Sequence, residues 1–204
     1  MPNWCDNTAT IYGTKEVLEA IVEKAKIQEE AFSMEQFMTV PEFPEKDKVL
    51  TGSKLESESF KNALIGNTNY AYDNWYDWCI GNWGTKWDMS ESYVSAIVQD
   101  GDRFKVMLSY STAWSPNNTF WTTFSELYPV EITHRYYEEG MMFIGEATYL
   151  DGRVNDLCLD VTEEMLLTIG AVANDEGGVD WETDQDYDLY DLFPLSEMNL
   201  TKTT

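Results

Sequence analysis

The sequence predicts an α+β fold of the ferredoxin-like kind, in which an antiparallel sheet in βαββαβ order carries both helices on one face. Three observations support the prediction: segments with an apolar residue at every second position alternate with segments of helical period, tight turns join strands, and no repeat of solenoid length is present. The 204 residues are 43% hydrophobic, which is enough for one large domain with a core. We also expect a long insertion after the first helix, an extra C-terminal hairpin and an acidic extension.

The first strand and the first helix are predicted near the N-terminus. Residues 3–12 alternate, and a glycine at position 13 ends the pattern. Thr14 is a favourable N-cap, so we expect a helix over residues 14–28 with an apolar stripe. The side chains expected to share the buried face of the strand are Cys5, Asn7, Ala9 and Ile11.

A hairpin and three further strands are predicted after residue 90. Asp100-Gly101 is a two-residue type I′ turn signal between two alternating segments, and two more tight turns follow at 139–140 and 151–152. The predicted strands are residues 91–99, 103–112, 130–138, 141–150 and 153–159.

The second helix is predicted between the second and third of these strands. Ser115 as N-cap and Pro116 in the first turn, where its missing N–H is harmless, indicate a helix over 116–128. Its apolar residues recur at helical spacing and should face the sheet. They are Phe120, Trp121, Phe124, Leu127 and Tyr128.

The long insertion is predicted over about residues 30–90. Two prolines exclude a helix over 39–44, because each removes a backbone donor and restricts the preceding residue. A polar loop is expected over 46–59 and a short helix over 59–65.

Four tryptophans fall within the thirteen residues 75–87, the densest aromatic group in the chain. One interpretation is a ligand platform, where indole rings stack on a base or a cationic group and polar neighbours hydrogen-bond to it. The other is a structural plug, a loop that caps the open face of the sheet; Gly81 and Gly84 permit close backbone approach in either case. The residues of the ligand interpretation are Trp78, Asn82, Trp83, Thr85, Lys86, Trp87 and Trp114.

Three segments carry a resemblance to a known family: residues 3–5 (Asn-Trp-Cys), residues 77–87 and residues 112–116 (Thr-Ala-Trp-Ser-Pro). In these segments the chain resembles the YubB-type ferredoxin-like domain of phage and plasmid proteins, over roughly residues 1–145. The resemblance implies the ferredoxin-like fold and no established activity. It also implies a mobile-element origin, a setting in which small acidic proteins that disarm host defences are common.

The charge balance excludes several classes of partner. Against 37 Asp and Glu stand 13 Lys and Arg, a formal net charge of −24. Such a surface repels phosphates, so we expect neither direct binding of nucleic acid nor docking on an anionic membrane. With no apolar run of about 18 residues and no pattern of a secretory signal, the expected location is the host-cell cytoplasm. Three widely spaced cysteines and one histidine predict no metal site, and we expect no cofactor.

Half of the net charge lies in the last quarter of the chain, where residues 151–204 carry 14 acidic and two basic residues. We assign residues 1–160 to the ferredoxin-like domain and residues 161–204 to an acidic extension. Aromatic residues interleave with the carboxylates over 175–191, which predicts that this stretch docks partly on the domain and holds its carboxylates outward. The predicted partner-binding residues are Asp175, Glu176, Asp180, Glu182, Asp184, Asp186, Asp188 and Asp191.

Two functions of different classes follow from these features. The first is a non-enzymatic interaction protein whose acidic surface mimics nucleic acid and binds a basic host protein, such as a nuclease or a DNA-binding protein. The alternative is a small-ligand or nucleotide binder, or an enzyme, that uses the Trp-rich segment 75–88. A third interpretation is that the excess of acidic residues only keeps the protein soluble, which explains the same composition. No catalytic residue is predicted: Cys79 and His134 offer a nucleophile and a base, but no protease signature surrounds the cysteine.

Overall fold

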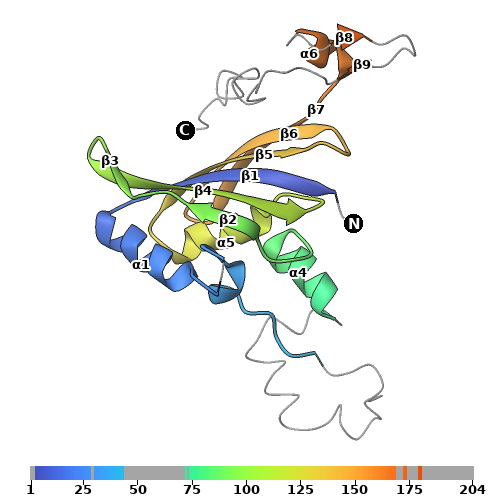
Figure 1. The fold of residues 1–204 in the computed structure, drawn as a ribbon. Coiled ribbons are helices and arrows are strands. Elements are labelled where there is room, and N and C mark those ends of the chain that lie inside the picture. The colour runs from blue at the N-terminus through green and yellow to red at the C-terminus, as the bar shows by residue number, and fades with distance from the viewer. Residues whose placement is uncertain are drawn as a thin grey trace, which may run out of the picture.

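An antiparallel sheet with helices packed against one face forms the body of the computed structural model (Figure 1). Apart from a 3-10 turn and a helix within the predicted insertion, the elements of residues 4–138 run strand, helix, strand, strand, helix, strand, as predicted, with two short strands together in the place of the second strand. This confirms the predicted ferredoxin-like class. The residues that the structure describes are 3–28, 30–43, 72, 74–168, 172–173 and 179–180.

Seven strands form the main sheet in the order β2-β4-β1-β5-β6-β7, with β3 also paired to β4. All of these pairs are antiparallel, and β1 is central, with Asn7 opposite Tyr110 of β4 and Tyr136 of β5. The predicted C-terminal hairpin, β6–β7, extends the sheet beyond β5. The strands are β1 (Trp4–Gly13), β2 (Ser90–Val94), β3 (Val98–Asp100), β4 (Arg103–Ala113), β5 (Glu131–Glu138), β6 (Phe143–Leu150) and β7 (Arg153–Asp160).

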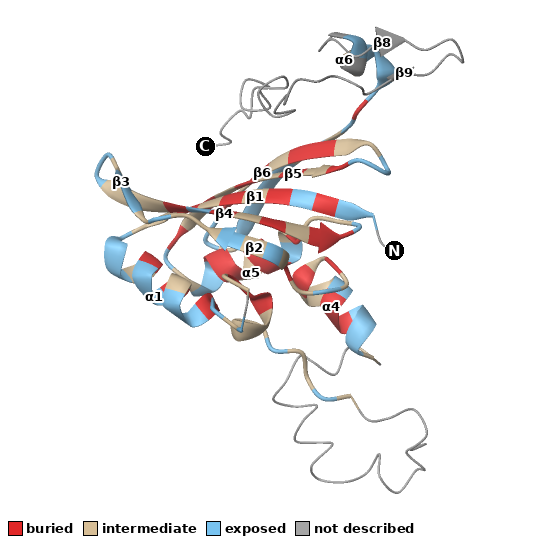
Figure 2. Ribbon diagram, in the orientation of Figure 1, coloured by how far each residue is buried: buried red, intermediate tan, exposed pale blue. Residues whose placement is uncertain are grey.

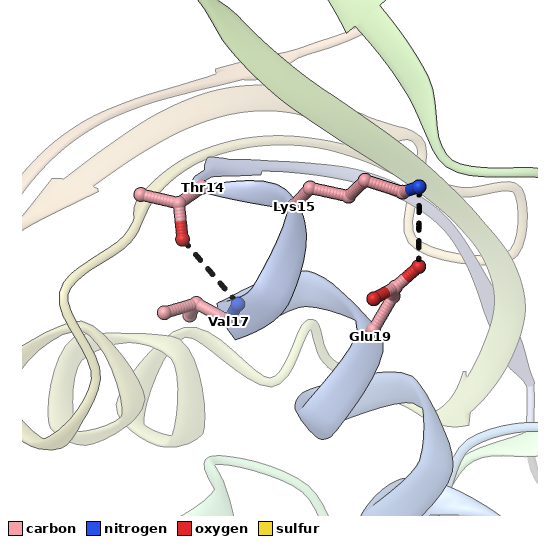
Figure 3. A network of polar contacts seen from close by, with 4 residues as sticks. All are labelled: Thr14, Lys15, Val17 and Glu19. Carbon is pink, nitrogen blue, oxygen red and sulfur yellow. Dashed lines mark hydrogen bonds and ion pairs between the residues drawn. The ribbon is translucent and has the colours of Figure 1, made fainter.

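The first helix, α1 (Lys15–Ala25), begins where the sequence predicts. The Thr14 hydroxyl accepts a hydrogen bond from the Val17 amide at 3.4 Å, and Lys15 pairs with Glu19 one turn later at 3.6 Å (Figure 3). The helix ends three residues before the predicted boundary, because the backbone turns extended at its C-cap. The residues of β1 expected on the buried face, Cys5, Asn7, Ala9 and Ile11, are all buried.

The strand predicted over 91–99 is divided into β2 and β3. Ser95 explains the division, because its hydroxyl accepts a hydrogen bond from the Met107 amide at 2.9 Å and so replaces a backbone carbonyl in the ladder. The pairing of β2 with β4 also shifts register between Ser90 and Tyr93, where Glu91 has a φ of 54°. The Asp-Gly turn at 100–101 joins β3 to β4 as predicted.

Helix α5 (Asn118–Leu127) begins two residues after the predicted start. Ser115 is not its N-cap, because the Ser115 hydroxyl donates to the Gly84 carbonyl at 2.8 Å, and Asn117 occupies the cap position instead. Leu127, predicted to face the sheet, is 62% exposed at the last turn. The remaining apolar face is buried as predicted at Phe120, Trp121 and Phe124.

The core lies between the sheet and the helices α1, α4 (Trp75–Trp83) and α5, which all cover the same face (Figures 1 and 2). Phe120 and Trp121 of α5 meet edge to face at 4.9 Å between ring centroids, and Phe37 meets Phe124 at 5.0 Å. The predicted insertion contributes directly to this core through Phe32, Met34, Trp78, Cys79 and Trp83.

The remaining elements are short. A 3-10 turn, η1 (Met34–Gln36), precedes residues 39–43, which are not helical, as predicted. The loop and helix predicted over 46–59 and 59–65 lie outside the described residues. A further helix, α6 (Glu163–Thr168), and a two-stranded pair follow β7, namely β8 (Val172–Ala173) and β9 (Val179–Asp180). Within the described ranges, no helix has both the length and the apolar character needed to cross a membrane.

Candidate functional site

The Trp-rich segment folds as helix α4 and the loop that follows it. The helix begins after Asn74, whose Oδ1 accepts a hydrogen bond from the Asp77 amide at 2.9 Å, and it ends at Gly84 with a φ of 85°. Glycine suits this end because, without a Cβ, it adopts the left-handed conformation at little cost, and its amide there donates to the carbonyls of Cys79 and Ile80 in the last turn. The segment is therefore largely helical where the sequence predicts a loop, and its tryptophans fall into two environments.

Trp78, Trp83 and Thr85 are buried, so they do not face a ligand at the surface as the platform interpretation expects. The two indoles meet edge to face at 5.6 Å between centroids, and the Trp83 indole N–H donates to the Met38 carbonyl at 3.2 Å. Asn82 donates to the Trp78 carbonyl at 2.9 Å, within the helix. These four side chains stabilise the packing and the end of α4.

Two hydroxyl groups fix the loop after α4 against the loop after β4. The Thr85 hydroxyl donates to the Ala113 carbonyl at 3.0 Å, and the Ser115 hydroxyl donates to the Gly84 carbonyl at 2.8 Å. Both loops are therefore held in register with each other. The exposed side chains that follow in each loop lie beside one another as a result.

An exposed aromatic cluster joins side chains from the start of β1, the residues after β4, the first turn of α4 and the loop that follows α4. Figure 1 shows that β1 begins beside the end of β4, on the side of the molecule where α4 lies. The ring centroid of Trp87 is 6.3 Å from that of Trp4 and 6.3 Å from that of Trp114, on which it stacks. Trp4, Trp87 and Trp114 are 43%, 39% and 42% exposed. Adjacent exposed rings of this size mark interaction sites on soluble proteins. The exposed aromatic cluster consists of Trp4, Tyr76, Lys86, Trp87 and Trp114.

The ammonium group of Lys86 lies over the rings of this cluster. Its Nζ is 4.4 Å from the centroid of Trp87, 4.9 Å from that of Trp114 and 5.9 Å from that of Tyr76. These distances are within the range of about 6 Å in which a ring quadrupole attracts a cation. Among the described residues, no carboxylate forms an ion pair with Lys86. The ring faces of the cluster thus hold a positive charge.

Trp114 has an unusual backbone conformation. Its φ is 66°, in the left-handed region that a bulky L-residue rarely adopts. Its amide donates to the Asn3 carbonyl at 3.0 Å, and the Thr112 hydroxyl donates to the Ser115 carbonyl at 2.7 Å. These hydrogen bonds maintain the turn that presents the indole beside Trp87.

A hollow of about 280 Å³ lies on the sheet face opposite the helices. It adjoins the cluster, because Asp6 is two residues after Trp4 on β1, on the same face and about 7 Å along the strand. The Asp6 carboxylate accepts a hydrogen bond from the Ser111 hydroxyl at 3.1 Å, and Glu91 supplies a second carboxylate. This open-face hollow is lined by Asp6, Asn7, Thr8, Glu91, Tyr93, Ser109, Tyr110 and Ser111.

His134 is buried at the centre of a polar network on the helix-covered face. Its Nε2 lies 3.0 Å from the Asn7 Oδ1, and its Nδ1 lies 3.3 Å from the Tyr149 hydroxyl. The amide nitrogen of Asn7 already donates to Thr112, so we assign Asn7 Oδ1 as the acceptor and Nε2 as the protonated nitrogen. Burial lowers the pKa of His134 to about 3, so the ring is neutral at pH 7.

Cys79 and His134 do not form a nucleophile–base pair. Cys79 is buried in α4, and burial raises the pKa of its thiol to about 11, with smaller contributions from Glu35 and Asp88. The thiol is therefore protonated at neutral pH and is a poor nucleophile. Within the described part of the chain, no group of three His, Cys, Asp or Glu side chains is placed to hold a metal ion.

Several carboxylates stabilise the fold rather than forming a free acidic surface. Asp88 accepts hydrogen bonds from the Ser33 hydroxyl at 2.5 Å and from the Met34 amide at 2.7 Å. Glu30 accepts two from Ser92, at 2.9 and 2.7 Å. Glu138 is fully buried and caps the turn between β5 and β6. These three carboxylates are therefore engaged within the fold and do not contribute to an acidic surface that a partner can contact.

The acidic residues predicted to bind a partner fall almost entirely outside the described residues. Asp180 lies in the short strand β9, where the backbone alone is described. The others lie outside those ranges, as does the expected docking of the stretch 175–191: Asp175, Glu176, Glu182, Asp184, Asp186, Asp188 and Asp191.

The comparison with known protein families agrees with the fold. Residues 82–176, just under half of the chain, match the model of a family described as the ferredoxin-like domain in Api92-like protein. The match and the observed sheet define a ferredoxin-like α+β protein. The family match overlaps the region of the predicted resemblance over residues 82–145 and continues beyond it to residue 176. The attribution to YubB-type phage and plasmid proteins stays a prediction.

Api92 itself is among the similar solved structures. The crystal structure of protein api92 from Yersinia pseudotuberculosis is similar with a TM-score of 0.41 and 9% sequence identity, covering 77% of this chain and 98% of that one. No curated protein sequence matches the chain.

Sequence reasoning missed two parts of the site. Tyr76 was not among the predicted ligand residues although it lies within the Trp-rich segment, and Trp4 entered only through the Asn-Trp-Cys resemblance segment, because it is far from that segment in the sequence. The hollow was also missed, although the outward positions of β1 and β4 are polar at Asp6, Thr8 and Ser109. Outward polar positions are the rule on a solvated sheet face, so the sequence holds no signal that sets these apart.

Proposed function

We propose that this chain is a non-enzymatic interaction protein of the phage or plasmid type that binds a basic host protein, such as a nuclease or a DNA-binding protein, and so inhibits a host defence. The observation that best supports the proposal is the exposed aromatic cluster beside the carboxylates of the open-face hollow. The cluster supplies apolar contact area, and the carboxylates supply charge complementarity to a basic partner.

The aromatic part of the surface has the composition of an interaction hot spot. Tryptophan and tyrosine are enriched where truncation of a side chain weakens a protein complex most. Trp4, Trp87 and Trp114 are held adjacent, so a partner buries them together. The hydrogen bonds of the flanking loops fix these rings before binding, which reduces the entropy lost on association.

The acidic part of the surface steers association and mimics nucleic acid. B-DNA carries one charge per about 1.7 Å of its axis, so 24 charges correspond to roughly 40 Å of duplex. A partner that binds DNA presents lysine and arginine side chains at similar density. In this proposal Asp6, Glu91 and the acidic stretch 175–191 occupy the positions of phosphates, and the electrostatic attraction accelerates encounter.

One observation favours the alternative function, a small-ligand or nucleotide binder. Lys86 lies beside Trp87 and Trp114, and a base stacked on an indole would place its phosphate within reach of the ammonium group. The net charge of −24 opposes binding of a polyanion, but it opposes a mononucleotide less.

Affinity capture from bacterial lysate at low and high salt, with mass spectrometry of the eluate, tests the proposal. We expect the wild type to capture a basic protein at low salt. Neutralising Asp180, Glu182, Asp184, Asp186 and Asp188 to Asn or Gln, or combining Asp6→Asn with Glu91→Gln, should sharply reduce its recovery. The matched control neutralises Glu16, Glu19 and Glu23 on α1 and should recover the protein as well as the wild type does. Equal recovery with the wild type and all variants would contradict the proposal and would leave solubility as the role of the acidic residues.

A further inference from the structure

The position of Lys86 in the exposed aromatic cluster identifies the chemistry that the cluster recognises. Three ring faces converge on one ammonium group, at 4.4, 4.9 and 5.9 Å from its nitrogen. Sites that bind organic cations have the same arrangement of aromatic rings around a positive charge. In this chain the cation comes from the cluster itself.

We propose that the exposed aromatic cluster is a recognition site for an arginine or lysine side chain of the partner, and that Lys86 occupies this site in the free protein. The proposal deepens the proposed function and rests on it for the identity of the partner as a basic protein. Binding then consists of an exchange, in which the incoming cation takes the ring faces and Lys86 moves into solvent.

The surroundings of the cluster favour an incoming cation. The open-face hollow places the Asp6 carboxylate two residues along β1 from Trp4, and Glu91 lines the same hollow. A guanidinium group satisfies both features, because it stacks on an aromatic ring and pairs with a carboxylate through parallel N–H bonds. We therefore expect arginine to bind more tightly than lysine.

Lys86 is suited to being displaced. Its backbone is held in place because the neighbouring Thr85 hydroxyl donates to the Ala113 carbonyl. Its side chain, in contrast, is a flexible four-carbon chain that ends in a strongly hydrated ammonium group. Exposed cation–π contacts of this kind are weak, so a partner cation supported by carboxylates competes effectively.

The same geometry distinguishes this proposal from nucleotide binding. If the cluster binds cations, removing the Lys86 charge vacates the site and strengthens binding of a small cation. If the cluster binds nucleotides, the Lys86 ammonium contacts the phosphate, and removing it weakens binding. Lys86→Met therefore shifts affinity in opposite directions for the two classes of ligand.

The test is an NMR titration of the tryptophan indole N–H signals with N-acetylarginine methylamide and, separately, with adenosine monophosphate. We expect the arginine probe to shift the signals of Trp87 and Trp114 and to leave those of the buried Trp83 and Trp121 in place. In Lys86→Met the arginine probe should bind roughly two- to fivefold more tightly. Combining Lys86→Met with Trp87→Ala should abolish that gain.

Lys24→Met is the matched control, because the Lys24 ammonium also lies over two rings, 4.9 Å from Phe37 and 5.8 Å from Tyr128, on a different part of the surface. It should leave the titration unchanged. Unchanged or weakened arginine binding in Lys86→Met, with an unaltered denaturation midpoint, would overturn the proposal, and so would nucleotide binding that this substitution abolishes. Because the probes are small molecules, a failed lysate capture would contradict the proposed function without altering this result.

Discussion

Two groups of tryptophans in this protein have opposite environments. Trp83 and Trp121 are buried, and their indole N–H groups donate to the Met38 carbonyl at 3.2 Å and the Tyr110 hydroxyl at 2.8 Å. Trp4, Trp87 and Trp114 are about two-fifths exposed. Among the described residues, no acceptor binds their indole N–H groups. The buried group therefore stabilises the fold, while the exposed group leaves both ring area and donors for a partner.

The largest expected effect is on the buried side of this comparison. Trp121→Ala removes a fully buried indole and leaves the Tyr110 hydroxyl without one of its partners. We expect the free energy of unfolding to fall by about 3–5 kcal/mol. Urea denaturation measures the change, and Trp87→Ala is the control from the exposed group, expected to lose less than about 1 kcal/mol. Similar losses in the two variants would remove the distinction between the groups.

Gly145 tests how closely the helix-covered face is packed. A Cβ at this position would overlap the Cζ of Tyr136, whose ring is buried and whose hydroxyl donates to Asp156. Gly145→Ala should therefore destabilise by roughly 1–3 kcal/mol through overpacking. A Cβ at Gly101 would have no atom within 4 Å. Gly101→Ala should therefore lower the free energy of unfolding by only about 1 kcal/mol, the cost of holding alanine at a φ of 65°. If Gly145→Ala lowers the free energy of unfolding no more than Gly101→Ala does, the Tyr136 ring can move to make room for the added methyl group.

The buried polar network predicts a pH dependence that the exposed cluster lacks. Burial lowers the pKa of His134 from 6.5 to about 3, so below pH 6.5 the unfolded chain takes up a proton that the folded chain does not. The stabilisation is present above pH 6.5 and is lost as the pH falls toward 3, by about 2 kcal/mol between pH 6.5 and 5. Denaturation of the wild type and of His134→Asn over this range measures it. Parallel pH profiles would show that His134 is not the group responsible.

The smallest expected effect concerns the strained turn in the exposed group. Trp114 has a φ of 66°, which costs an L-residue about 1–2 kcal/mol and costs glycine almost nothing. Trp114→Gly should therefore raise the free energy of unfolding by up to about 1 kcal/mol after the greater chain entropy of glycine is counted. The same substitution should weaken capture of the partner. A lower free energy of unfolding would contradict the strain argument, and undiminished capture of the partner would contradict a binding role for Trp114.

Local sequence rules predicted much of the fold. The alternation in β1, the Thr14 cap and the Asp-Gly turn at 100–101 each depend on residues within one or two turns of each other, and each was confirmed. Two of the errors arose where a side chain binds a distant backbone group. Ser115 bonds to Gly84 instead of capping α5, and Ser95 bonds to the backbone of β4 and interrupts its own strand.

The site was less predictable than the fold. The Trp-rich segment was correctly singled out, but the sequence does not show which indoles face the core, because α4 mixes apolar residues on all sides. The proximity of Trp4 to Trp87 and Trp114 follows from the pairing of β1 with β4, which places Trp4 opposite Ala113. Contacts between residues about 80 to 110 positions apart require that register, which no short pattern specifies.

The most direct test of the exposed aromatic cluster as the binding surface is hydroxyl-radical footprinting of the free protein and of its captured complex. Oxidation of each side chain is measured by mass spectrometry. In the free protein we expect Trp4, Trp87 and Trp114 to be oxidised readily, along with Leu127, which is 62% exposed at the end of α5. In the complex we expect the three cluster indoles to be protected while Leu127 stays as reactive as in the free protein. Continued oxidation of all three in the complex would contradict the claim that the partner binds there.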